Sequence, residues 1–359
     1  MASLLTAFLS SYIITLLIIR LQHLHDRYSG DHDVSGPQKF HTGSIPRIGG
    51  ISIAIGLLTA VLVRLQSNNT SIVEISLLMC AIPTFSIGLI EDLTKKISVR
   101  ARLHFTAVAA ALAAYYLGAQ ITRLDIPGID FVLSFPIVAM LFAVFAITGL
   151  SNAYNIIDGF NGLSSMVGIM TLLGLAYVGY VIDDTLIEFL SLIMVAAIMG
   201  FFPWNYPRGH IFLGDGGAYL IGFWIGVLTV LLVARHSVVS PWFALLINAY
   251  PILETLFTIY RRKIHQGKSL SQPDGIHFHT LIYRRVLLKN NCGQKGLSAN
   301  AQTAPHLWIL TGLSISPAII WWDSTVILIF FLIVFFLSYI WIYSRIIKFK
   351  TPKWLILNF

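Results

Sequence analysis

Polar residues at a regular spacing mark one segment that could bind a divalent cation. The segment Ser151–Gly162, SNAYNIIDGFNG, repeats Asn152, Asn155 and Asp158 every third residue and contains no lysine or arginine. Residues three apart share one face of a helix, so the two amides and the carboxylate can act together on Mg²⁺ or on a pyrophosphate bound through it. An ordinary turn rich in asparagine and glycine, between two helices, is the alternative interpretation.

A second segment, FLGDGGA, places Asp215 among glycines directly before an apolar run. Glycines let a ligand approach the backbone closely, and the free N–H groups at the start of a helix attract phosphate. Asp215 can hold a hard cation at the same place. A plain glycine turn is the alternative here.

Adjacent carboxylates and clustered basic residues mark two further segments. Glu91 and Asp92 open the segment EDLTKKISVRARL, which fits a charge-balanced, solvated loop as well as it fits a catalytic acid pair. Upstream, the segment KFHTGSIPRIGG places Lys39, His41 and Arg47 before two glycines. These side chains can bind phosphates, or they can simply anchor the chain at the inner face of a membrane.

A histidine pair lies in the segment PDGIHFHTLIYRR, which contains His277 and His279. A His-x-His pair can bind zinc. Because neighbouring cysteines and further histidines at a suitable spacing are lacking, we do not expect a zinc site.

The elements that must position these segments are membrane spans. Hydrophobic residues make up 56% of the 359 residues and charged residues only 11%, whereas a soluble domain carries about 25% charged residues. A helical span needs about 20 apolar residues. Eleven such runs occur, at about 4–20, 48–65, 72–89, 103–119, 132–150, 163–182, 186–204, 217–234, 241–260, 305–321 and 324–344. We therefore predict an all-α polytopic membrane protein with about eleven transmembrane helices, forming a single domain over residues 1–359.

The distribution of lysine and arginine predicts the orientation. If the spans alternate, 20 of the 24 basic residues fall on one face, and that face also receives all the polar segments described above. The positive-inside rule makes this face cytoplasmic, with the N-terminus periplasmic and the C-terminus cytoplasmic. The segment 261–304 becomes a long cytoplasmic loop that carries His277 and His279. The net charge of +8 is thus explained by topology, and we expect no nucleic-acid partner because no platform of aromatic and basic residues stands out.

Taken together and in this order, these segments resemble a known family. PRIGG, the acidic pair after the third span, NAYNIIDGFNGL, FLGDGGA and a histidine-containing inner loop are similar to the polyprenyl-phosphate N-acetylhexosamine-1-phosphate transferases. The resemblance runs from about Lys39 to Arg285. Eleven spans with a periplasmic N-terminus are similar to the branch that transfers GlcNAc-1-phosphate.

The resemblance implies a reaction and its partners. The protein would transfer a HexNAc-1-phosphate, most simply GlcNAc-1-phosphate, from a UDP-HexNAc to undecaprenyl phosphate and release UMP. Mg²⁺ would be the cofactor, with Mn²⁺ as a substitute. The protein would lie in the lipid bilayer of a bacterial inner membrane, with its active site on the cytoplasmic face, and would start O-antigen or a related cell-envelope glycan.

The resemblance also implies roles for individual residues. Asp158 and Asp215 match the metal ligands, and Asp158 joins Glu91 and Asp92 in the catalytic set. The substrate-binding residues would be Lys39, His41, Arg47, Asn152, Asn155, His277 and His279, with the asparagines shaping the nucleotide and pyrophosphate site and His277 near the donor phosphates.

The chain departs from the family pattern at four positions. It has Glu91 where the family usually has aspartate, Asn161 where it has an acid, Ala218 where it has serine, and Thr280 where it has a final histidine. Because Asp92 is retained, the role of general base, or of orienting the lipid phosphate, falls to it. We favour direct attack by the lipid phosphate, and the sequence leaves a covalent aspartyl-phosphate route open.

A multi-span transporter of an anionic substrate is the rival interpretation. Transporters place ionisable residues near the midplane and often carry inverted repeats. Here the acids gather at one face and no inverted repeat is visible, which favours the enzyme. The sequence leaves open which UDP-HexNAc is used, which glycan is built and whether the protein forms a homodimer.

Overall fold

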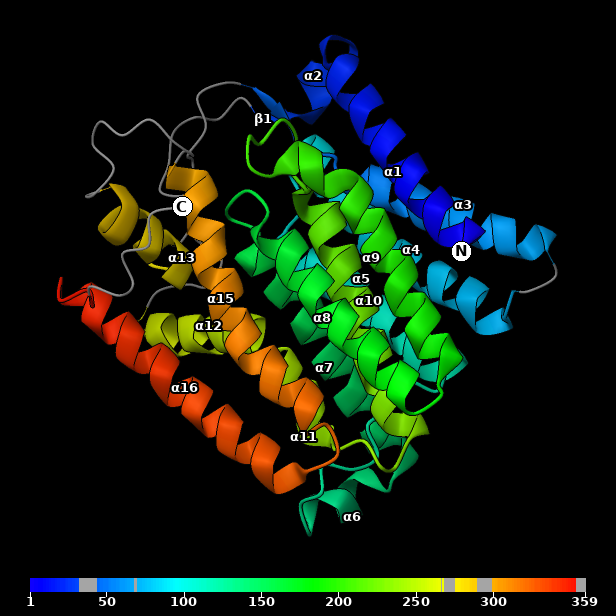
Figure 1. Cartoon of the computed structure of the whole chain (residues 1–359), viewed down its shortest axis with the longest axis vertical. Helices are drawn as coiled ribbons and strands as arrows, with labels where there is room; N and C mark the ends of the chain where they lie inside the picture. Colours follow the sequence, from blue (N-terminus) through cyan, green and yellow to red (C-terminus); the bar gives the residue numbers. More distant parts are fainter. Residues whose placement is uncertain (32–43, 68–69, 266, 268–274, 289–298, 353–359) are drawn as a thin grey trace.

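The protein is a bundle of helices, described by a computed structural model over residues 1–31, 44–67, 70–265, 267, 275–288 and 299–352. Within these residues the only sheet is a short antiparallel pair, β1 (Gly30–Asp31) and β2 (Ile45–Pro46). The prediction of an all-α polytopic membrane protein is therefore confirmed, and Figure 1 shows the arrangement.

Each of the eleven predicted apolar runs coincides with a helix or a helix pair. The long helices are α1 (Ala2–Arg20), α3 (Gly50–Gln66), α4 (Ile72–Thr94), α5 (Val99–Tyr116), α7 (Pro136–Ile157), α8 (Leu163–Val181), α9 (Thr185–Asn205), α10 (Gly214–Arg235), α15 (Ala299–Ile320) and α16 (Thr325–Ile347). The pair is α11 (Pro241–Ile247) and α12 (Ala249–Tyr260), and the shorter elements are α2 (Gln22–Ser29), α6 (Ile129–Leu133), α13 (Phe278–Leu281) and the π-helical turns η1 (Arg261–His265) and η2 (Ile282–Leu287).

Eight helices of the described chain are long and apolar enough to cross a bilayer, or nine if the bent pair is one span. The predicted count of eleven is higher because it includes α3 and α5. Helix α3 is apolar but has only 17 residues, and α5 carries Arg100, Arg102 and His104 in its first two turns.

Helix α10 forms the centre of the bundle. Of its most apolar stretch 94% is buried inside the protein, and it packs against α7, α4, α3 and α8. A helix that is apolar on all sides is stable only when it is surrounded. Glycines bring α7 close, because a side chain on Gly222 would lie 2.8 Å from the Ser151 Cα. The start of α10, which holds Asp215, is thus surrounded by α3, α4 and α7.

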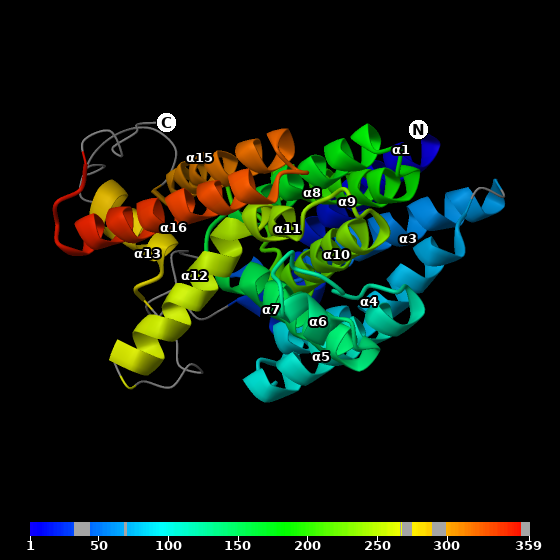
Figure 2. The same cartoon turned by 90° about the horizontal axis from the view of Figure 1, so that it is seen from below.

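The ninth apolar run is broken rather than straight. Its two halves, α11 and the helix that runs from Ala249 through η1 to Ile264, meet at an angle of 77° around Asn248. Figure 2 shows α12 leaving the bundle, with α16 and α13 beside it. The bend places α12 below the segment that carries the histidines.

Ion pairs connect the loops at the end of the bundle where α6 lies in Figure 1, which is opposite to the start of α10. Asp184 caps α9 and binds Arg235 at 2.8 Å and the His236 ring at 2.6 Å. Arg123 pairs with Asp125 at 2.7 Å and donates to backbone carbonyls of the loop after α10. These charged residues hold the loops together, and Asp215 lies at the other end of the bundle.

Candidate active site

Backbone hydrogen bonds bring the PRIGG and FLGDGGA segments together. The Phe212 N–H donates to the Pro46 carbonyl at 2.8 Å, and the N–H groups of Gly49 and Gly50 donate to the carbonyls of Phe212 and Leu213 at 3.0 and 2.9 Å. A side chain on Gly50 would lie 2.6 Å from the Gly217 Cα, so glycine is needed for this approach. The pairing sets Arg47 beside the start of α10.

Asp92 caps the start of α10. Its Oδ1 accepts the Asp215 N–H at 2.8 Å and its Oδ2 accepts the Gly216 N–H at 2.9 Å. The first N–H groups of a helix have no partner within the helix, so a carboxylate stabilises them well. The preceding Gly214 has a φ of +77°, and a side chain there would lie 2.6 Å from the Asp92 Oδ2. Only glycine fits this turn.

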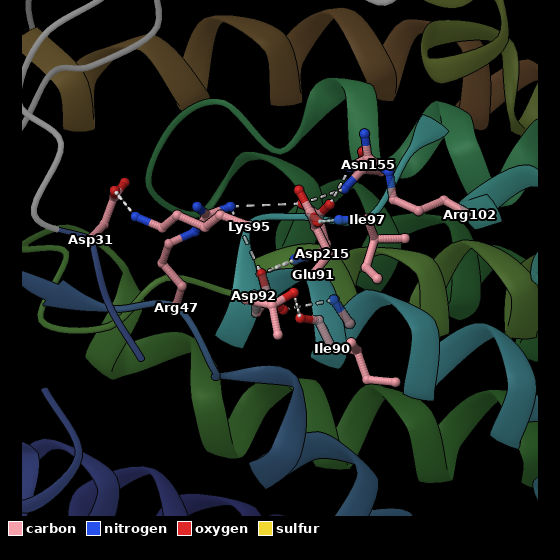
Figure 3. A network of polar contacts seen from close by, with 12 residues as sticks. Asp31, Arg47, Ile90, Glu91, Asp92, Lys95, Ile97, Arg102, Asn155 and Asp215 are labelled. Atoms are coloured by element: carbon pink, nitrogen blue, oxygen red, sulfur yellow. Dashed lines mark hydrogen bonds and ion pairs between the residues drawn. The ribbon is translucent and has the colours of Figure 1, made fainter. Parts of the chain in front are cut away.

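Asp215 lies between two guanidinium groups, as Figure 3 shows. Its Oδ2 accepts a hydrogen bond from Arg102 at 2.6 Å, and its Oδ1 accepts one from the Asn155 amide at 3.0 Å. The Arg47 guanidinium lies 3.9 Å from the Asp215 Oδ1 and 3.8 Å from the Asp92 Oδ1. Burial disfavours the charged form of Arg47, but the nearby carboxylates, Asp92 and Asp215 foremost, outweigh this effect and raise its pKa.

Glu91 is adjacent to Asp92 in the chain but has a different hydrogen-bond partner. Its Oε2 accepts the Ile97 N–H at 2.7 Å and so closes the turn between α4 and α5. Lys95 within this turn has a φ of +54° and reaches Asp31 at 3.0 Å. The acidic pair therefore supports two different elements.

Asp158 follows the last residue of α7 and is electrostatically close to Asp215. Burial, together with the nearby charge of Asp215, raises the pKa of the Asp158 carboxyl to about 8, and the charge of Arg47 only partly opposes this. Asn155 reaches Asp215 from the last turn of the same helix, whereas the Asn152 amide donates to the Thr148 carbonyl at 2.8 Å.

The histidine pair packs against the loop that follows Asp158. The rings of His277 and His279 are stacked, with centroids 5.1 Å apart, and His279 lies edge-on to Phe160. A side chain on Gly159 would lie 3.0 Å from the His279 Nε2, so this glycine lets the ring approach.

A buried carboxylate on α12 fixes the orientation of His277. Glu254 binds the His277 Nδ1 at 2.9 Å, the Phe278 N–H at 3.1 Å and the Tyr339 hydroxyl at 2.8 Å. A carboxylate on Nδ1 holds the ring in one orientation, with Nε2 on its other side. Sequence reasoning did not assign Glu254 to the site.

The structure gathers most of the predicted site residues at one end of the bundle. Asp92, Arg47, Asn155 and Asp215 meet directly. Asp158 is electrostatically coupled to Asp215, and Glu91, Asn152, His277 and His279 lie around this cluster. Lys39 and His41 lie outside the described residues. Arg102 was missed, since its segment offers four basic residues and only the packing of α5 against α4 and α10 selects one of them.

The carboxylates have the chemistry of a magnesium site, although the described residues contain no group of three or more His, Cys, Asp or Glu side chains arranged around one point. Mg²⁺ keeps several waters and typically takes only one or two carboxylates, the remaining ligands coming from substrate phosphates. Asp215 and Asp158, with the Asn155 amide beside them, fit this pattern.

Comparison with known proteins shows what the chain is similar to. Residues 74–233 match the model of glycosyl transferase family 4. The central part of the chain is thus similar to glycosyl transferase family 4. The matched range contains Glu91, Asp92, Arg102, Asn155, Asp158 and Asp215, so the centre of the site lies inside the family region.

Individual relatives of the chain come from several bacteria. The chain is 29% identical to the probable undecaprenyl-phosphate N-acetylglucosaminyl 1-phosphate transferase of Bacillus subtilis, over 78% of this chain and 77% of the relative. It is 27% identical to the undecaprenyl-phosphate alpha-N-acetylglucosaminyl 1-phosphate transferase of Escherichia coli O157:H7, over 78% and 76%. It is also 26% identical to the phospho-N-acetylmuramoyl-pentapeptide-transferase of Staphylococcus epidermidis, over 68% and 79%.

Proposed function

We propose that the protein transfers GlcNAc-1-phosphate from UDP-GlcNAc to undecaprenyl phosphate and releases UMP. The names of its relatives in Bacillus subtilis and Escherichia coli support this acceptor and this sugar. The observation that carries the proposal is the cluster of Asp215, Asp92, Arg47 and Arg102 at one end of an apolar bundle. A membrane-bound phosphate can meet a soluble nucleotide sugar only at such an end.

In the proposed reaction, an oxygen of the lipid phosphate attacks the phosphorus that carries the sugar. One P–O bond forms, the P–O bond to UMP breaks, and the electron pair of that bond leaves with UMP. Both reactants are anions, so their approach requires neutralisation of charge and alignment of the attacking and leaving oxygens. Arg47 and Arg102 supply positive charge at the site.

Mg²⁺ is the cofactor in this proposal, held by Asp215 and Asp158, and when bound it neutralises the donor diphosphate and the developing charge on UMP. Asn155 orients the Asp215 carboxylate by its hydrogen bond of 3.0 Å. His277, whose Nδ1–H donates to Glu254 at 2.9 Å, is held close to the donor phosphates in this proposal.

The geometry of Asp92 favours direct attack over a covalent aspartyl-phosphate route. Both of its oxygens accept N–H groups from the start of α10, and the residue is only 1% exposed. A nucleophile needs an oxygen that can reach the substrate. We therefore propose that Asp92 positions Asp215, instead of acting as the general base that the family resemblance implies.

The pathway and the location complete the proposal. We propose a bacterial inner membrane, a site facing the cytoplasm, and a product that starts O-antigen or a related cell-envelope glycan. The asymmetric distribution of basic residues supports this orientation.

One assay tests the reaction. Purified protein in detergent receives undecaprenyl phosphate, Mg²⁺ and one donor from a panel of UDP-GlcNAc, UDP-GalNAc and UDP-MurNAc-pentapeptide, and UMP release is followed. We expect release with UDP-GlcNAc that stops in excess EDTA and is lost in the Asp215→Asn variant. UMP release only with UDP-MurNAc-pentapeptide would overturn the proposal that GlcNAc is the transferred sugar. UMP release that continues in excess EDTA would overturn the proposed requirement for Mg²⁺.

A further inference from the structure

Arg102 is hydrogen-bonded to the Asp215 carboxylate, which is a ligand of Mg²⁺ in the proposed function. Its guanidinium donates to the Asp215 Oδ2 at 2.6 Å, while Asn155 donates to the other oxygen at 3.0 Å. We infer that Arg102 is the counter-ion of Asp215 while no cation is bound, and that it passes to the phosphate of the acceptor lipid when a cation takes Asp215. This inference rests on the proposed function and adds a residue to it.

The exchange follows from charge. A magnesium ion binds a carboxylate oxygen at about 2.0 Å, which would place it within a few ångströms of the Arg102 guanidinium. Two cations at this separation repel each other strongly in a partly buried site. The Asn155 amide is neutral and can stay, so of the two groups that hydrogen-bond to the Asp215 carboxylate Arg102 is the one that must leave.

Arg102 has unused capacity to bind an anion. Its side chain is 20% exposed, and its buried Nε–H makes no hydrogen bond within the described part of the chain. The planar guanidinium fork matches the oxygens of a phosphate. Figure 3 shows Arg47 on the other side of Asp215, so a phosphate beside the bound cation would lie between two guanidinium groups.

The surroundings of Arg102 favour a lipid phosphate over a nucleotide phosphate. Large apolar side chains that are between 38% and 45% exposed surround this end of α4 and α5, namely Ile90, Leu93, Val99, Leu103 and Phe105. Apolar side chains exposed on an outer helix face contact lipid tails in a membrane protein. Arg102 thus lies where an apolar surface meets the carboxylate cluster, as an amphiphilic acceptor requires.

Direct cation binding tests the first half of the inference without any substrate. Mn²⁺ is titrated into purified full-length protein and free Mn²⁺ is measured by electron paramagnetic resonance. Removing the competing charge in Arg102→Gln should tighten Mn²⁺ binding about tenfold, while Arg102→Lys should stay close to the wild type. The matched control is Arg100→Gln, because Arg100 is exposed on the same helix. Unchanged or weaker binding in Arg102→Gln, or no Mn²⁺ binding to the wild type, would overturn the inference.

Steady-state kinetics test the second half. For both Arg102→Gln and Arg102→Lys we expect the KM for undecaprenyl phosphate to rise about tenfold, because a charge-assisted, bidentate contact is lost. The KM for UDP-GlcNAc should not change. A rise only in the KM for UDP-GlcNAc, or no change in the KM of either substrate, would contradict the inference that Arg102 binds the phosphate of the acceptor lipid. UMP release would persist in these cases, so the proposed function would survive the failure of this inference.

Discussion

Two neighbouring carboxylates serve different elements because they are one residue apart on a helix. Successive residues of a helix point about 100° apart, so Asp92 faces the start of α10 while Glu91 faces the turn before α5. The sequence could identify this pair as unusual. It could not divide the roles, since the partners come from the backbone of Asp215, Gly216 and Ile97.

Exchanging the acids of this pair should have unequal effects. In Asp92→Asn the NH₂ group meets one backbone N–H of α10, so one cap is lost and Asp215 is displaced. We expect UMP release to fall by about a hundredfold or more, the scale of a misplaced catalytic group. Glu91→Asp should stay nearly active and Asp92→Glu should be severely impaired, at matched expression levels. The reverse ranking would show that Glu91 carries the chemistry.

The raised pKa of Asp158 predicts how the stability of the metal-free protein depends on pH. Burial and Asp215 raise this pKa from the ordinary value of 3.8 to about 8. Between these values the folded state holds a proton that the unfolded state has lost, so the stability falls as pH rises through this window. Asp158→Asn cannot ionise and lacks this loss.

The measurement is thermal unfolding in detergent with EDTA, at pH 5 and pH 8. We expect the unfolding temperature of Asp158→Asn, relative to that of the wild type, to be higher at pH 8 than at pH 5. Parallel behaviour of the two proteins would contradict the raised pKa. Adding Mg²⁺ at pH 8 should recover stability in the wild type and not in the variant.

At the scale of the elements, the apolar runs predicted where helices lie because a bilayer demands about 20 apolar residues for each span. They did not predict the 77° break at Asn248, since the run 241–260 is apolar on both sides of it. They also could not show that α12 would hold His277 through Glu254. Such contacts depend on which faces of distant helices meet, and the period of one helix does not fix this.

Glycine in α4 sets how closely that helix approaches the start of α10. A side chain on Gly88 would lie 2.6 Å from the Gly216 Cα, and backbone atoms cannot give way cheaply. Gly88 is also one helical turn before Asp92. Gly88→Ala should therefore separate Asp92 from α10, cost about 1–3 kcal/mol, and remove most of the activity.

Gly149 in α7 offers the matched control. A side chain there would meet nothing within 4 Å, so Gly149→Ala gains helix propensity without a clash. The Gly88→Ala and Gly149→Ala variants are compared by their rates of UMP release and by their unfolding temperatures in detergent. If Gly88→Ala remained as active and as stable as Gly149→Ala, the close contact between α4 and α10 would not be needed.

At the scale of the whole molecule, the order of the chain explains why the site forms. Alternating helices return PRIGG, the acidic pair, NAYNIIDGFNGL and FLGDGGA to the same end, and α10 carries the last of them through the centre. This convergence was predictable from span counting and from the distribution of basic residues. The sequence alone could not supply the distances, because hydrogen bonds between remote loops fix them.

The two ends of α10 allow a direct test of orientation. The helix has 22 residues and is about 33 Å long, close to the hydrocarbon thickness of a bilayer. Arg208 is exposed just before it and Ser237 is exposed just after it. If the site faces the cytoplasm, these two positions lie on opposite sides of the membrane.

Cysteine labelling shows on which side of the membrane each position lies, in a variant from which Cys80 and Cys292 have been removed. In intact cells an impermeant maleimide should label Ser237→Cys and leave Arg208→Cys unlabelled, since the reagent reaches only the periplasmic face. After the cells are opened, both variants should react, which shows that Arg208→Cys was shielded by the membrane and not by the fold. Labelling of Arg208→Cys in intact cells would place Asp215 and its neighbours outside, where neither UDP-sugars nor the positive-inside rule would put them.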